Sequence, residues 1–181
     1  MQPFCVRTGW VRPTLASSLL LLAPATAGAV SLTTPCHLRL YNTHTCKRID
    51  LVYRIGDVPV PEALDQLQSF LCDHRNACQH PFDPALFDIL RDLAHQVGRD
   101  EAEFQVISAY RSPESNEALR AARPGVAKHS LHMEARAIDI RLPGMATARL
   151  RDAAIALGRG GVGYYRDLDF IHVDTGRVRT W

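Results

Sequence analysis

The stretch "HSLHMEARAIDIRL", residues 129–142, places two histidines and an aspartate before and within an alternating segment. In its second half apolar and polar residues alternate, which predicts a strand whose apolar face carries Ile138, Ile140 and Leu142. Asp139 then points to the opposite face of the sheet. The stretch therefore predicts a strand with one face in the core and the other facing a cleft.

A metal site is one interpretation of the polar residues in this stretch. His132 precedes Asp139 by seven positions, which is far enough for a turn to bring both side chains to one point. The later segment "DFIHVD", residues 169–174, supplies His172 from a predicted neighbouring strand. Two histidines and one carboxylate with an open fourth position are typical of hydrolytic zinc sites. A histidine in a strand also fits a hydrogen-bonded core position, so the spacing alone leaves both interpretations open.

The rest of the chain predicts strands and helices in mixed order. Period-two patterns and apolar runs predict strands at residues 37–42, 49–54, 104–108, 136–142, 161–165 and 169–174. Helical spacing and capping residues predict helices at residues 61–74, 81–98, 112–122 and 147–160. Asp83 and Pro84 are typical of a helix start, and Gly98 of a helix end. Together they predict one α+β domain at residues 30–181, with a mostly antiparallel sheet flanked by helices.

The composition fits this class. The 181 residues are 46% hydrophobic and 22% charged, with a formal net charge of +2. This profile predicts a single globular domain with a real core. A near-balanced charge excludes both extensive disorder and the strongly basic surface of a nucleic-acid partner. We expect a monomer.

Residues 1–29 predict a signal peptide. They contain Arg7 and Arg12 and no acidic residue, followed by a short apolar run and the small residues Ala25-Thr26-Ala27. A basic start, a short apolar middle and an A-x-A exit are typical of secretory leaders. An uncleaved membrane anchor is the alternative.

Export changes the interpretation of the cysteines, since four of them follow the leader. In an oxidising compartment four cysteines predict two disulfides. Proximity in sequence favours Cys36–Cys46 and Cys72–Cys78, although three connectivities are open and unpaired buried thiols are the alternative. A cysteine zinc site is disfavoured because the chain has no C-x-x-C pair.

Three segments resemble a known family. They are "SAYRSPESN" (108–116), "KHSLHMEARAIDIRLPG" (128–144) and "GVGYYRDLDFIHVDTGRVRTW" (161–181). They resemble the YcbK-like murein endopeptidases, of the superfamily of zinc D-alanyl-D-alanine carboxypeptidases, VanX-type dipeptidases and the hedgehog domain. The family pattern S-x-H-x-x-G-x-A-x-D is met by Ser130, His132, Ala137 and Asp139, and the later H-x-D by His172 and Asp174.

The resemblance implies a hedgehog-like or D,D-peptidase-like fold, and a periplasmic zinc enzyme that hydrolyses peptide bonds in peptidoglycan cross-links or stem peptides. It implies that His132, Asp139 and His172 bind Zn²⁺. Arg111 matches the family arginine that holds the substrate carbonyl oxygen and the developing oxyanion, a task suited to a fixed guanidinium.

Two positions qualify the resemblance. The family glycine is replaced by Ala135, and we expect that only a small side chain is needed there. For the general base, relatives place a carboxylate three residues before the last ligand, which is Asp169 here. That spacing works only if the strand begins irregularly. Asp174 shares a face with His172, so of the two we favour Asp174 as the base, with orientation of the imidazole as its alternative role.

Three functions are consistent with these residues. The first is an exported zinc murein endopeptidase, and the second is a zinc-containing module that binds peptidoglycan without turnover. The third is a D,D-dipeptidase or carboxypeptidase acting on small peptides. The sequence does not determine which bond is hydrolysed: a D-alanyl–diaminopimelyl link, a direct link between two diaminopimelyl residues, or another.

Overall fold

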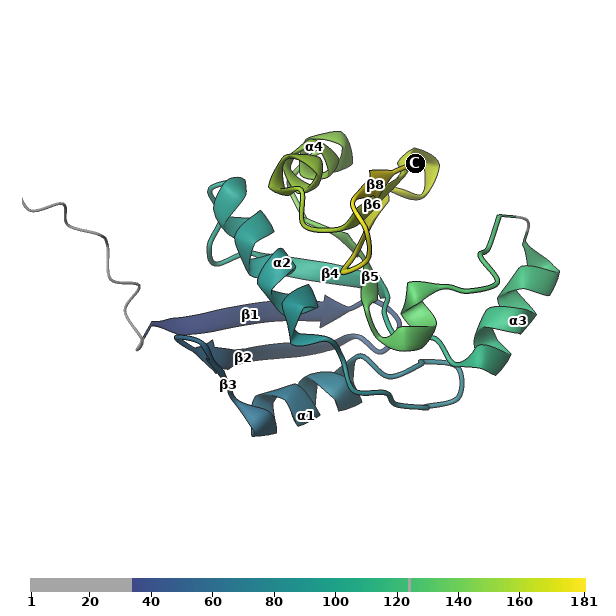
Figure 1. Cartoon of the computed structure of the whole chain (residues 1–181), viewed down its shortest axis with the longest axis horizontal. Helices are drawn as coiled ribbons and strands as arrows, with labels where there is room; N and C mark the ends of the chain where they lie inside the picture. Colours follow the sequence, from purple (N-terminus) through teal and green to yellow (C-terminus); the bar gives the residue numbers. More distant parts are fainter. Residues whose placement is uncertain (1–33, 124) are drawn as a thin grey trace, which may run out of the picture. The chain divides into compact units, whose positions relative to one another are not determined.

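The computed structural model describes residues 34–123 and 125–181. The predicted leader, residues 1–29, lies outside the described residues. Within them one eight-stranded sheet and four α-helices form an α+β domain (Figure 1). The predicted fold class is confirmed.

The sheet has the strand order β3-β2-β1-β4-β5-β7-β6-β8. Neighbours are antiparallel except for the parallel pairs β1–β4 and β6–β8, so the predicted antiparallel character is confirmed. The strands are β1 (Pro35–Asn42), β2 (Lys47–Ile55), β3 (Val58–Pro59), β4 (Glu103–Ser108), β5 (Ala137–Arg141), β6 (Gly161–Tyr165), β7 (Phe170–Asp174) and β8 (Arg179–Thr180).

The predicted helices are all present, with shorter bounds. They are α1 (Pro61–Phe70), α2 (Pro84–Gln96), α3 (Pro113–Ala122) and α4 (Thr147–Leu157), with the 3₁₀ turns η1 (Leu131–Glu134) and η2 (Arg166–Leu168). Asp83 and Ser112 cap α2 and α3 by accepting hydrogen bonds from backbone N–H groups in the first turn, and a proline follows each cap. No helix in the described part of the chain is long and apolar enough to cross a bilayer.

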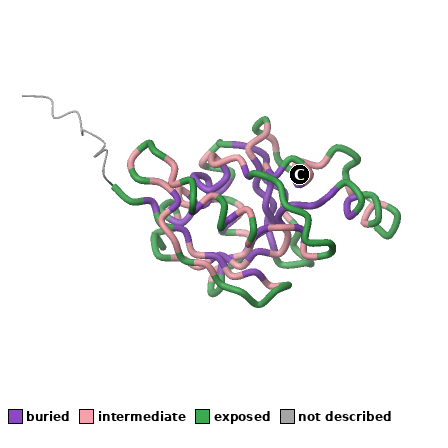
Figure 2. Tube along the Cα trace, turned by 90° about the horizontal axis from the view of Figure 1, so that it is seen from below, coloured by how far each residue is buried: buried purple, intermediate pink, exposed green. Residues whose placement is uncertain are grey.

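The core lies between α2, α4 and one face of the central strands. Ile138 and Ile140 of β5 and Ile171 of β7 are fully buried in the same cluster as the apolar residues of α2 and α4. Figure 2 shows buried segments through the middle of the domain and exposed turns around it. The helix α3 is set apart from α2 and α4, near the segment that carries η1 (Figure 1). Because α2 and α4 cover only the face of β5 and β7 that carries the isoleucines, the opposite face is left for polar side chains.

The structure does not support the predicted pairing of Cys36 with Cys46. The hairpin register places Cys36 opposite Arg54, whereas Cys46 follows the turn beside the far end of β1. Six residues of strand separate the two ends by roughly 20 Å, far beyond the ~7 Å that a disulfide spans between Cα atoms. No disulfide joins any of the four cysteines of the described chain in this structure. The prediction of Cys36–Cys46 was wrong because residues ten apart are distant when a strand lies between them.

Candidate metal centre

Two of the three predicted ligands lie opposite each other in the sheet. β5 and β7 pair antiparallel with Asp139 directly across from His172. Opposite residues of an antiparallel pair project to the same face and are separated by about 5 Å between Cβ atoms. Because Ile138 and Ile140 occupy the core face, both polar side chains point away from it, as predicted.

The third residue, His132, is delivered by the turn η1. The Ser130 hydroxyl accepts a hydrogen bond from the His132 N–H at 3.4 Å and begins this turn. The His132 carbonyl accepts the Arg111 N–H at 3.1 Å, which ties η1 to the segment after β4. Ala135 then ends η1 in the left-handed conformation, and the chain enters β5 two residues later.

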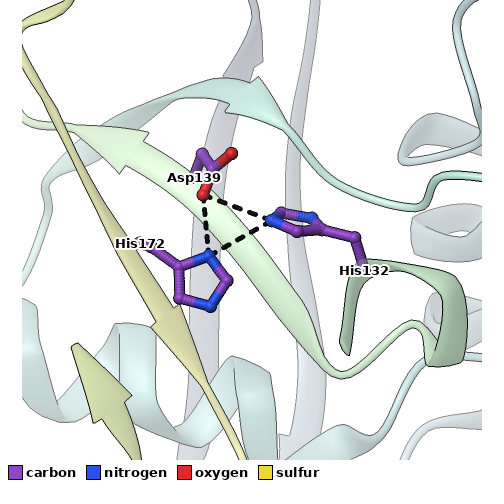
Figure 3. Close-up of side chains that lie close together, drawn as sticks. All are labelled: His132, Asp139 and His172. Atoms are coloured by element: carbon purple, nitrogen blue, oxygen red, sulfur yellow. Dashed lines mark hydrogen bonds and ion pairs between the residues drawn. The ribbon is translucent and has the colours of Figure 1, made fainter. Parts of the chain in front are cut away.

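The three side chains converge on one point (Figure 3). The Oδ1 atom of Asp139 lies 3.3 Å from His132 Nε2 and 2.9 Å from His172 Nδ1, and the two nitrogens are 3.2 Å apart. These donor atoms all lie within 4.8 Å of one another, and all three residues are buried. The predicted juxtaposition is therefore confirmed.

In each ring the outward nitrogen, the one that faces away from Asp139, donates a hydrogen bond, which determines which nitrogen carries the proton. His132 Nδ1 donates to the carbonyl oxygen of Ala109 at 2.6 Å, and His172 Nε2 donates to Asp174 Oδ2 at 3.0 Å. Both partners can only accept, so the neutral imidazoles turn their lone pairs inward, toward the Asp139 carboxylate. Two lone pairs and an anionic oxygen at these distances require a cation or an additional proton between them. The donor set thus fits a divalent metal ion.

The ionisation of this cluster agrees with its geometry. Burial raises the pKa of Asp139, but the imidazoles of His132 and His172 outweigh it, and the pKa lies below its ordinary value. Burial lowers the pKa of His172, but hydrogen bonds to Asp139 and Asp174 raise it above the ordinary value. Both shifts have the same cause, the close approach of the carboxylate and the imidazoles, and a metal ion would have to displace any proton held between them.

Asp174 is fully buried behind His172. Its Oδ1 accepts the N–H groups of Gly161 and Gly176 at 3.0 and 2.8 Å, and Arg179 binds both of its oxygens at 3.1 and 2.7 Å. Burial raises the pKa of Asp174, but the hydrogen bonds from His172 and Arg179 hold it below its ordinary value. Asp174 is therefore an anion whose oxygens are occupied by fixed donors, one of them the His172 ring.

Asp169, the other base candidate, is placed differently. It precedes β7 with a φ of 52°, so the strand does begin irregularly. Its side chain is 66% exposed, accepts a hydrogen bond from the Thr147 hydroxyl at the start of α4, and lies 3.7 Å from Arg141. The structure brings Asp169 to α4 and not to the three predicted ligands.

Arg111 follows β4 and is held beside the cluster. Its Nη1 donates to Asn116 Oδ1 at 3.2 Å and its Nη2 to Ser108 Oγ at 3.3 Å. The residue is only 7% exposed, and burial lowers the pKa of its guanidinium despite the attraction of Asp139. Among the described residues its Nε is one of two buried side-chain polar atoms without a hydrogen-bond partner. The guanidinium is therefore held in a fixed orientation with one N–H that no group of the described protein accepts.

Ala135 corrects our expectation about the family glycine. Its φ is 51° and its ψ 38°, and it is fully buried. The position therefore demands the left-handed conformation, which costs an L-residue other than glycine roughly 1–2 kcal/mol. Smallness is not the only requirement, and alanine is strained here.

We predict that glycine is accepted at position 135 and valine is not. For Ala135→Gly, the relief of strain, ~1–2 kcal/mol, offsets the entropy of glycine and the lost methyl burial, so the free energy of unfolding changes by less than about 1 kcal/mol. Ala135→Val should lose about 3 kcal/mol or more, because strain and overpacking add. Urea unfolding measures both. Ala137→Val is the control, since Ala137 is equally buried but lies in a strand; equal losses at both positions would contradict the backbone argument.

Our sequence reasoning did not identify several residues that support the site. Asn116 binds Arg111, Arg179 binds Asp174, and the ring of Trp181 lies 5.2 Å from that of His172 between centroids. Asn116 lies within the quoted segment "SAYRSPESN", which was a usable signal. Arg179 lies in the two-residue strand β8 and Trp181 follows it. A strand this short has no periodicity from which its pairing could be predicted.

A buried pair of imidazoles and a carboxylate, backed by fixed acceptors and flanked by an arginine, defines a candidate metal-dependent hydrolase. A family described as peptidoglycan L,D-endopeptidase MepK matches residues 30–181. The peptidoglycan L,D-endopeptidase MepK of Escherichia coli K12 is 38% identical over 173 residues, which cover 90% of this chain and 94% of the relative. The probable peptidoglycan L,D-endopeptidase MepK of Haemophilus influenzae is 35% identical over 167 residues, which cover 92% of this chain and 90% of the relative.

The chain belongs to the peptidoglycan L,D-endopeptidase MepK family. The resemblance found from the sequence and the predicted enzyme class, a peptidase, are thereby confirmed.

Proposed function

We propose that this protein is an exported zinc peptidase that hydrolyses peptide bonds in peptidoglycan cross-links. The observation that carries the proposal is the convergence of three buried donor atoms, His132 Nε2, Asp139 Oδ1 and His172 Nδ1, next to Arg111. Two imidazoles and one carboxylate suit zinc and leave a coordination position for catalysis. When bound there, the ion would act as a Lewis acid that activates water and polarises the scissile carbonyl.

The protein's own residues hold the reacting groups in place. Ala109 and Asp174 fix the two imidazoles from behind, so that the ligand atoms need no reorganisation on metal binding. Arg111, fixed by Ser108 and Asn116, would place its guanidinium against the oxygen on which negative charge develops. Such a preorganised donor stabilises the transition state more than the ground state.

We assign Asp174 to the orientation of His172, because its oxygens are occupied by fixed donors. Asp174→Asn should lower zinc affinity by about 10–100-fold, while kcat at saturating zinc changes by less than about tenfold. Metal titration and steady-state kinetics measure the two effects separately. If Asp174 were the general base, kcat would fall by about 10²–10⁴ at full zinc occupancy. Asp169→Asn is the control, and we expect it to change neither quantity.

The relatives' name specifies an L,D bond. Of the cross-links left open by the sequence, a D-alanyl–diaminopimelyl link joins two D-centres, whereas a direct diaminopimelyl pair joins an L-centre to a D-centre. We therefore propose the direct diaminopimelyl cross-link as the substrate bond.

Defined cross-linked muropeptide dimers test this assignment. Zinc-loaded protein should convert dimers with the direct link into two monomers, which mass spectrometry detects, and leave D-alanyl-linked dimers intact. Chelator should stop the reaction and zinc should restore it. Binding of the dimers with no cleavage by zinc-loaded protein would instead support the non-catalytic module. Release of single residues or dipeptides would support a carboxypeptidase or dipeptidase.

We propose export to the periplasm on the basis of the predicted leader at residues 1–29. In that compartment we propose a disulfide between Cys72 and Cys78, which close one short loop in which the Asp73 N–H donates to the Cys78 carbonyl at 2.9 Å. The secreted protein should then be lighter by two hydrogens before treatment with a reductant than after it. Equal masses would exclude the disulfide.

A further inference from the structure

The glycines of β6 leave space for two side chains from the end of the chain. Gly163 lies opposite His172, and Gly161 shares its face of the strand. A methyl group at Gly163 would come within 2.7 Å of the Trp181 ring, and one at Gly161 within 2.3 Å of the Arg179 guanidinium. The indole of Trp181 therefore lies directly over the sheet next to a predicted metal ligand, with its ring tilted 52° to that of His172.

Trp181 is held firmly in this position. Its backbone N–H donates to Val162 at 3.3 Å, its carbonyl accepts the Tyr164 N–H at 3.0 Å, and its indole N–H donates to the Tyr165 hydroxyl at 3.1 Å. The Arg179 guanidinium lies 4.8 Å from the ring centroid. Trp181 is nevertheless 51% exposed and Tyr165 37%. Two ordered aromatic side chains thus keep large apolar areas in water beside the candidate metal centre.

We infer that Trp181 and Tyr165 form an aromatic wall that binds the peptide arm of the substrate next to the scissile bond. The inference rests on the proposed function. The wall adjoins a ligand of the metal, so whatever contacts it lies next to the reacting bond. The parts of a stem peptide that can cover an aromatic face are alanine methyl groups and the methylene chain of diaminopimelate. Because both rings are already ordered, binding loses little side-chain entropy.

The inference predicts an effect on KM and not on kcat. At saturating zinc, Trp181→Ala should raise KM for directly linked dimers about tenfold, with kcat within about twofold of wild type. Gly163→Ala should have the same effect with the indole retained, because the new methyl displaces it. Tyr41→Ala is the matched control, since Tyr41 also packs against an arginine, Arg48, at 4.4 Å, but on β1. An unchanged KM in both variants, or a loss confined to kcat or zinc content, would overturn the inference.

A binding measurement separates this inference from the proposed activity. The chain has two tryptophans, Trp10 in the predicted leader and Trp181, so Trp181 is the sole indole fluorophore once the leader is removed or Trp10 is replaced by phenylalanine. Its emission should shift when the dimer, or the free stem peptide, is added to zinc-loaded protein, whether or not cleavage follows. The disaccharide alone should leave it unchanged. Cleavage without any shift in emission would refute the aromatic wall but leave the proposed peptidase activity standing. A shift without cleavage would support the aromatic wall and refute the peptidase activity. A shift with the disaccharide alone would refute recognition of the peptide.

Discussion

Replacing any of His132, Asp139 or His172 by alanine is expected to reduce turnover of cross-linked dimers to below about one-thousandth of wild type. Loss of a residue that only supports a ligand costs about 10–100-fold, and loss of a ligand should cost more. Each variant removes one of three donor atoms that lie within 4.8 Å of one another, so the remaining two hold the ion weakly. Metal analysis should find close to one zinc per wild-type molecule and much less in each variant.

His129→Ala is the matched control for these variants. His129 belongs to the same stretch as His132 but is exposed and outside the cluster. We expect wild-type zinc content and turnover from it. Thermal unfolding of the apo proteins tests whether the three alanine variants are folded. Wild-type protein that hydrolyses dimers at an undiminished rate after exhaustive chelation would refute the metal mechanism.

Much of this cluster was predictable because strand periodicity is a local property. Alternation placed Asp139 opposite the buried isoleucines, and the same rule placed His172 on one face of its own strand. The antiparallel pairing of β5 with β7 then brings the two into register. What the pattern does not contain is the partner of each outward nitrogen. Ala109 contributes a backbone carbonyl, which any residue has, so the sequence gives no sign of it.

The predictions that failed depend on tertiary structure or on single backbone angles. Ala135 adopts a φ of 51° because η1 must turn into β5, and alanine itself gives no indication of this. Cys36 and Cys46 are near in sequence but lie at opposite ends of a hairpin. β3 and β8 are two residues long and owe their conformation to the strands they pair with. Trp181 was missed for the same reason.

Arg111→Ala is expected to lower kcat by about 10²–10³-fold with little change in zinc content, the range measured when a single oxyanion donor is removed. The guanidinium is buried, fixed by Ser108 and Asn116, and has one N–H without a partner. Arg111→Lys should recover little activity, although it keeps the charge. An ammonium group cannot bind both fixed acceptors and also place a donor against the oxyanion.

Arg141→Ala separates this effect from a general loss of positive charge. Arg141 lies on the same face of β5 as Asp139, two residues further on, and its Nε donates to Gln105 at 2.7 Å. If Arg111 acts as a directed donor, Arg141→Ala should keep kcat within about threefold of wild type, the small effect expected of a partly exposed charge. If the cluster needed only nearby positive charge, Arg111→Lys would be active and Arg141→Ala impaired. That pair of results would refute the assignment of Arg111 to the oxyanion and leave the metal ligands unaffected.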